Sequence, residues 1–126
     1  MLELYQTEWC PASHRVRQRL TELGLDYLVR QVPIARDDRI SLLAATGGDT
    51  IPALLLEDGT AVVGDDSIGT YLDGRFDDPP EAEAHRLKAE KAHRRSLEEE
   101  CKCLHNFTPS HPQASERKEW NHGCDQ

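Results

Sequence analysis

The chain has 126 residues, enough for one domain and an extension, with a formal net charge of −8 and a mean hydropathy of −0.68. The negative charge argues against nucleic acid or an anionic membrane as a partner. No apolar run is long enough to span a membrane and no signal-peptide pattern opens the chain, so we expect a cytoplasmic protein. In a reducing compartment, the four cysteines are expected to be reactive, metal-binding or incidental, not a disulfide framework.

The first 46 residues carry the periodicity of two strands and two helices. Residues 2–5 alternate in the manner of a short strand. Apolar side chains then recur at helical spacing over residues 11–23, and Gly24 is placed to end that helix. Residues 26–32 are typical of a second strand, and residues 37–46 of a short second helix.

A hairpin and a third helix are predicted next. The nearly continuous apolar run 51–56 is typical of a strand buried on both faces. Asp58-Gly59 is a hairpin turn signal, 61–63 is the returning strand, and a helix follows from Gly64. The predicted order is β-α-β-α-β-β-α. Because strands bridged by helices pair in parallel and a hairpin pairs antiparallel, the four-stranded sheet should be mixed.

The composition changes abruptly at the Asp-Asp-Pro-Pro sequence of residues 77–80. Residues 81–100 are rich in Ala, Glu, Lys, Arg and His, with high helix propensity but only a thin apolar stripe. We therefore expect a charged helical extension over residues 77–104 and a disordered tail over 105–126.

The C-terminal part also carries sulfur and imidazole side chains whose types suit zinc. Their spacing matches no usual zinc knuckle, so we expect no metal, with incidental thiols in the tail as the simpler reading. These side chains are Cys101, Cys103, His105, His111, His122 and Cys124.

A cysteine at a strand-to-helix junction is the candidate nucleophile. Cys10 follows the first strand, and Pro11 stands at the first helical position, where proline is tolerated. Unpaired backbone N–H groups and the positive end of the helix dipole favour a thiolate at this place. Cys10 is therefore expected to be reactive, the alternative being a small apolar residue in a loop.

Three sequence signals resemble a known fold family. They are Cys-Pro-Ala-Ser at residues 10–13, Ile51-Pro52 and Gly64-Asp65-Asp66. In the predicted topology they resemble the thioredoxin fold, specifically glutaredoxins and the N-terminal domain of glutathione transferases. The resemblance implies a thioredoxin-like α/β domain over residues 1–76, with Cys10 as the reactive thiol and Ser13 where dithiol members carry a second cysteine.

The resemblance also implies a glutathione site. Pro52 matches the family's cis-proline, whose turn exposes the backbone of the preceding residue to a thiol ligand. The loop before the last helix matches the place where relatives hold the γ-glutamyl end of glutathione. Trp9 is expected either to stack over the ligand or to cap the core. The implied binding residues are Trp9, Pro11, Thr50, Ile51, Pro52, Asp65 and Asp66.

The activity implied by the resemblance is monothiol, glutathione-dependent thiol–disulfide exchange, because Ser13 cannot resolve a mixed disulfide. Glutathione or a similar thiol would be the cosubstrate, and disulfide-bonded or glutathionylated proteins the substrates. Transfer of glutathione to an electrophile, or binding without turnover, are the alternatives. Two departures count against transfer: the transferase Glu-Ser pair falls on Gly64 and Asp65, and the polar residues after 76 cannot build a helical second domain.

Overall fold

The structure, a computed structural model, describes the backbone of residues 1–106 and the side chains of residues 1–99. The chain divides into two compact units, Met1–His85 and a second that begins at Arg86. The predicted disordered tail is residues 105–126; its first two residues continue a helix, and the remainder lies outside the described residues. The side chains of the cysteines and histidines from Cys101 onwards lie outside them as well.

The first unit is built on the predicted mixed sheet. Its strands are β1 (Leu2–Gln6), β2 (Tyr27–Gln31), β3 (Ala53–Leu55) and β4 (Ala61–Val63), arranged in the order β2-β1-β3-β4. β1 pairs in parallel with β2, whereas the β1–β3 and β3–β4 pairs are antiparallel. This topology confirms the thioredoxin-like prediction. β3 is shorter than the predicted strand 51–56. Residues 51 and 52 form a turn before β3, and Leu56 belongs to the hairpin loop after it, where its N–H donates to the Thr60 carbonyl.

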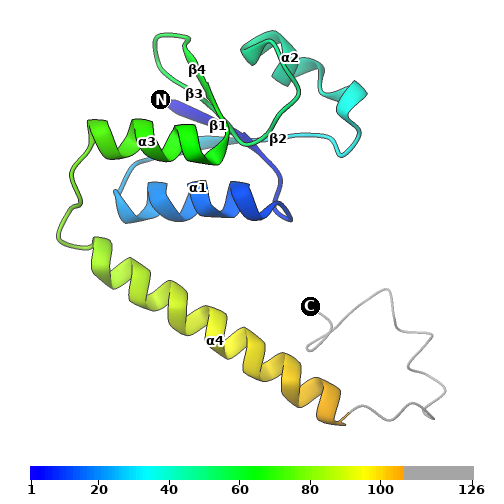
Figure 1. The fold of residues 1–126 in the computed structure, drawn as a ribbon, viewed down its shortest axis with the longest axis vertical. Coiled ribbons are helices and arrows are strands. Elements are labelled where there is room, and N and C mark those ends of the chain that lie inside the picture. Colours follow the sequence, from blue (N-terminus) through cyan, green and yellow to red (C-terminus); the bar gives the residue numbers. More distant parts are fainter. Residues whose placement is uncertain (107–126) are drawn as a thin grey trace. The chain divides into compact units, whose positions relative to one another are not determined.

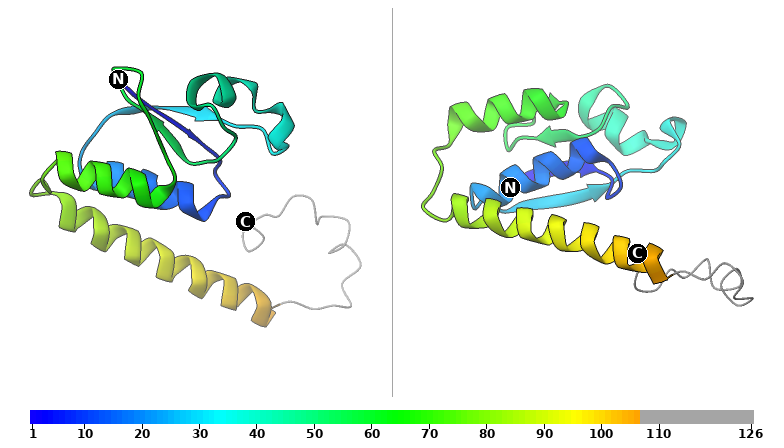
Figure 2. Two further views of the ribbon diagram at one scale, coloured as in Figure 1. Left: turned by 45° about the horizontal axis from the view of Figure 1, so that its top comes forward. Right: turned by 60° about the horizontal axis from the view of Figure 1, so that its bottom comes forward.

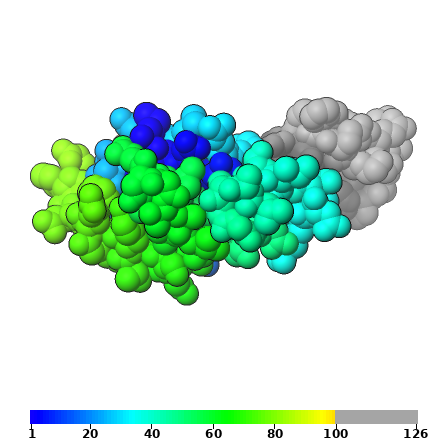
Figure 3. Space-filling model, turned by 90° about the horizontal axis from the view of Figure 1, so that it is seen from above, coloured from blue at the N-terminus to red at the C-terminus, as the bar shows by residue number. Residues whose placement is uncertain are grey.

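Three helices cover the sheet. They are α1 (Pro11–Glu22), α2 (Ile40–Thr46) and α3 (Asp65–Arg75), and a 3-10 turn at Arg36–Asp38 replaces the start of the predicted second helix. Figures 1 and 2 show α1 and α3 side by side on one face of the sheet and α2 on the other. In Figure 3 the α2 segment, in cyan, lies beside the hairpin and α3, in green.

Strand alternation divides the core into two clusters, one on each face of the sheet. Leu4 and Leu54 point to the side of α1 and α3, and Tyr5 and Ala53 to the side of α2. The larger cluster comprises Leu4, Val16, Leu20, Leu23, Leu54, Ile68 and Leu72. The smaller cluster comprises Tyr5, Val32, Leu42 and Ala53. Together they fix the sheet and therefore the loops at its ends.

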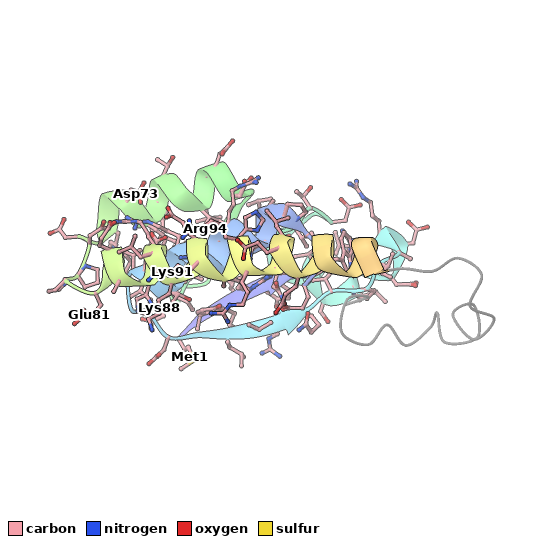
Figure 4. All side chains as sticks on the ribbon, turned by 90° about the horizontal axis from the view of Figure 1, so that it is seen from below. Met1, Asp73, Glu81, Lys88, Lys91 and Arg94 are labelled. Carbon is pink, nitrogen blue, oxygen red and sulfur yellow. The ribbon has the colours of Figure 1, made fainter. Side chains whose placement is uncertain are left out.

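The last described helix, α4 (Ala82–Asn106), begins in the first unit and continues through the described part of the second. Its sequence is rich in charged residues, and Figure 4 shows Lys88, Lys91 and Arg94 along it at three-residue intervals. None of the described helices combines the length and apolar character needed to cross a membrane.

Candidate functional site

The strand pairing brings three segments together at one edge of the sheet, namely at the ends of β1, β3 and β4. Tyr5 lies opposite Ala53, and Ala53 lies opposite Val63. Because both pairs are antiparallel, the loop after β1, the turn before β3 and the start of α3 meet at the same edge. The predicted Cys10 loop, Ile51-Pro52 turn and Asp65-Asp66 helix start therefore lie close together.

Cys10 occupies the N-cap position of α1, with extended backbone angles and Pro11 as the first helical residue. Its Sγ accepts a hydrogen bond from the backbone N–H of Ser13 at 3.4 Å. Its carbonyl accepts from His14 N–H at 3.0 Å, as the first helical bond. The sulfur thus takes the place that an Asn, Asp or Ser oxygen takes at many helix starts.

The surroundings of Cys10 favour its thiolate. Burial raises the pKa of the half-buried thiol, but hydrogen bonds from Ser13 and Ala12 outweigh burial and hold that pKa below its ordinary value. The negative charge of Asp65 acts in the opposite direction, towards a higher pKa of Cys10.

Ser13 lies in the first turn of α1, three residues after Cys10. Ser13 is fully buried, and its Oγ has no partner of ordinary hydrogen-bond geometry among the described residues. It nevertheless lies near enough to Cys10 to lower the thiol pKa. A buried hydroxyl without a partner is destabilising, so its presence here suits a thiolate or a ligand sulfur more than it suits the fold.

The Ile51–Pro52 peptide bond is cis, as the resemblance implies. The Pro52 carbonyl accepts from the Gly64 N–H at 2.8 Å, which ties this turn to the start of α3. Gly64 has a φ of 95°, in the region that favours glycine. No hydrogen bond among the described residues uses the backbone N–H or carbonyl of Ile51. Thr50, before the turn, is exposed.

The first turn of α3 carries the two predicted acidic residues, of which Asp65 is paired with an arginine and Asp66 is exposed. Arg15 on α1 donates to Asp65 Oδ2 from Nε at 2.8 Å and from Nη2 at 2.5 Å. This contact is the main cause that holds the pKa of the Asp65 carboxyl below its usual value. The sequence carries no local signal for this contact, because the two residues lie 50 positions apart.

A polar network braces the loop that leads to Cys10. Gln6, at the end of β1, is fully buried, and its Nε2 donates to Glu8 at 2.9 Å and to Gln31 at 3.1 Å. Arg17 on α1 donates to the Gln6 side-chain oxygen and to the Thr7 carbonyl. Sequence reasoning missed this network, although a glutamine ending an apolar strand is a signal for a buried polar contact.

Arg39 was missed as well, and it fixes the segment before the cis-proline. Its guanidinium is buried and donates to the carbonyls of Pro33 at 2.8 Å, Asp49 at 2.7 Å and Ile34 at 3.1 Å. The bond to Asp49 holds the chain three residues before Pro52.

Trp9 does not cap the core, because 62% of its surface is exposed beside Cys10. Pro11 is also exposed. All the predicted binding residues therefore belong to the three segments at this edge of the sheet.

Comparison with known proteins identifies the domain. Residues 9–75 match the family model of the glutathione S-transferase N-terminal domain. No curated protein matches the chain. Among solved structures, a glutathione S-transferase domain-containing protein from Marinobacter aquaeolei VT8 is 33% identical, with a TM-score of 0.53, over 61% of this chain and 40% of its own. A glutathione S-transferase from Rhodospirillum rubrum F11 is 29% identical, with a TM-score of 0.53, over 60% of this chain and 34% of its own.

A third structure, a glutathione S-transferase from Sinorhizobium meliloti 1021, is 28% identical, with a TM-score of 0.54, over 59% of this chain and 32% of its own. The chain therefore matches between about a third and two fifths of the length of these three proteins.

Proposed function

Because the chain belongs to the glutathione S-transferase N-terminal domain family, we propose that it catalyses glutathione-dependent thiol–disulfide exchange with Cys10 as the nucleophile. The observation that carries this proposal is the Cys10 sulfur itself. It lies at the start of α1, accepts a backbone hydrogen bond from Ser13, and has a lowered thiol pKa. A partly exposed thiolate at a helix N-terminus is the usual form of a reactive cysteine.

The exchange takes two steps. The Cys10 thiolate attacks the glutathione sulfur of a glutathionylated protein, a bond forms between Sγ and that sulfur, and the protein thiolate leaves and takes a proton from solvent. Ser13 provides no second thiol, so a second glutathione thiolate attacks the bound glutathione sulfur. This step forms glutathione disulfide and returns Cys10 as thiolate.

Binding of the thiol uses the open groups at the same edge. The free N–H and carbonyl of Ile51 pair with the backbone of the ligand's cysteinyl residue. The N-terminus of α3 attracts a ligand carboxylate through its unpaired N–H groups and dipole. The indole of Trp9 covers the ligand from the solvent side.

A second candidate, transfer of glutathione to an electrophile, is favoured by one observation, the match to a transferase domain model. In that reaction the thiolate to be stabilised belongs to glutathione, with Ser13 as the hydrogen-bond donor. Transfer also needs a pocket for the electrophile, and the chain matches only part of the length of the transferases it resembles.

Mass spectrometry separates these functions. A variant with Cys101, Cys103 and Cys124 replaced by Ser is treated with oxidised glutathione, and exchange predicts one glutathionyl group on Cys10 that reduced glutathione releases. The further change Cys10→Ser is the control and should give no adduct. Rapid conjugation of chlorodinitrobenzene with no adduct on Cys10 would support transfer and contradict exchange.

A further inference from the structure

The Arg15–Asp65 ion pair places a guanidinium against the first residue of α3. Arg15 lies five residues after Cys10 on α1, and Asp65 is the first residue of α3, so the pair joins the two helices beside the nucleophile. Two nitrogens of the guanidinium meet the same carboxylate oxygen, at 2.8 and 2.5 Å. The Arg15 side chain is 64% exposed and that of Asp65 only 22%, so Arg15 is the more solvent-accessible member of the pair.

This ion pair changes which charged group of a ligand Asp65 can bind. A ligand ammonium at Asp65 would have to compete with the guanidinium charge of Arg15 and with its two charge-assisted hydrogen bonds to Oδ2. The adjoining cleft between α1 and α3 has a volume of about 140 Å³ and is lined by both members of the pair. The other acidic residue, Asp66, is exposed, where water and salt weaken its attraction for a cation.

The same geometry favours a ligand carboxylate. A guanidinium has five N–H donors, and the hydrogen bonds from Arg15 to Asp65 use Nε and one N–H of Nη2. The remaining donors belong to a side chain that is 64% exposed and that pairs with the first residue of α3, where the helix dipole also favours an anion.

Resting on the proposed function, we propose that Arg15 is a specificity-determining residue. As the built-in counter-ion of Asp65, it makes the site recognise the carboxylate, and not the ammonium, at the end of a low-molecular-weight thiol that meets α3.

Two ligands that differ only in the ammonium group test the proposal. They are S-methylglutathione and S-methyl-glutaryl-cysteinylglycine, in which hydrogen replaces the ammonium of the γ-glutamyl group. Their dissociation constants are measured by calorimetry on the full chain. The wild type should bind the glutaryl ligand at least as tightly as S-methylglutathione. Arg15→Gln should shift the ratio of the two constants roughly tenfold towards S-methylglutathione, because Asp65 becomes free for the ammonium.

Three further variants assign the effect. Arg15→Lys keeps the charge and should keep most of the wild-type ratio, and Asp65→Asn added to Arg15→Gln should remove the shift. Arg30→Gln is the matched control, since Arg30 is a comparably exposed arginine that pairs with Glu3 at 3.0 Å between β1 and β2. It should leave the ratio unchanged.

The inference is overturned if the wild type prefers S-methylglutathione fivefold or more, if Arg15→Gln leaves the ratio unchanged, or if neither ligand binds. The thioether ligands undergo no exchange, so this outcome is independent of turnover. Absence of the glutathionyl adduct on Cys10 together with selective binding would contradict only the proposed exchange activity.

Discussion

At the scale of single residues, the reactivity of Cys10 follows from the groups that face its sulfur. Hydrogen bonds from Ser13 and Ala12 outweigh burial, so the thiol pKa is lower in the folded chain than in the unfolded chain. The thiolate is therefore populated at a lower pH, and alkylation should rise with pH and level off below the ordinary thiol value of about 8.5. Iodoacetamide rates against pH, with the other three cysteines replaced by Ser, give the midpoint. A midpoint at or above that value would refute the prediction.

Ser13 should show opposite effects on stability and on reactivity. Its hydroxyl is buried without a partner of ordinary geometry, so Ser13→Ala removes an unsatisfied group whose burial costs about 1–3 kcal/mol. The melting temperature should stay the same or rise. The alkylation midpoint of Cys10 should rise too, because one of the groups that lower its pKa is lost. A fall in melting temperature with an unchanged midpoint would assign Ser13 a purely structural role.

At the scale of elements, Arg39 joins the segment after β2 to the segment before the cis-proline. Arg39→Met would leave the carbonyls of Pro33, Ile34 and Asp49 without that donor in a partly buried place. We expect a loss of about 2–4 kcal/mol in the free energy of unfolding, measured by urea denaturation. Arg39→Lys should recover only part of it, because an ammonium cannot match the planar fork of a guanidinium.

Arg36 provides the control for Arg39. It lies on the adjacent 3-10 turn, is exposed, and pairs loosely with the Asp49 carboxylate at 3.8 Å. Arg36→Gln should cost less than about 1 kcal/mol. Equal losses for the two arginines would show that the buried carbonyl contacts of Arg39 contribute little.

The elements were predictable where periodicity or turn chemistry was strong. The helix after Cys10 and the Asp58-Gly59 hairpin follow from apolar spacing and a strong turn signal. The start of α2 was misplaced, because residues 36–38 form a 3-10 turn that has no distinct sequence pattern. The apolar run 51–56 was read as one strand, but its first two residues belong to the cis-proline turn.

Only those parts of the candidate site that lie within one short sequence segment were predictable. The Cys10 motif and Ile51-Pro52 are visible in sequence, and their resemblance to a family linked them. The Arg15–Asp65 pair and the contacts of Gln6 and Arg39 depend on side-chain geometry between distant segments. Such contacts form only after the sheet has brought those segments together, so they cannot be predicted from the periodicity and spacing of the sequence.

At the scale of the whole molecule, the first unit contains what the fold and the proposed site need. Every residue of the two core clusters lies between Leu2 and Phe76, and so do Cys10 and the segments beside it. Deletion after Asn106 should therefore leave the melting temperature within about 2 °C of the full chain and the exchange rate of Cys10 unchanged. Differential scanning calorimetry and release of the glutathionyl adduct measure the two quantities.

The competing hypothesis is a metal site closed by Cys101, Cys103, Cys124 and the nearby histidines, whose side chains lie outside the described residues. Metal binding would then be coupled to folding of the C-terminal part, and a chelator would lower its protection from proteolysis. Zinc is measured in the full chain purified without added metal, with the Cys101→Ser/Cys103→Ser double variant as control. Stoichiometric zinc that disappears in the double variant would make the C-terminal residues a second folded part and contradict the disordered-tail prediction. Zinc well below one equivalent in both proteins, with no effect of a chelator on proteolysis, would contradict the metal site.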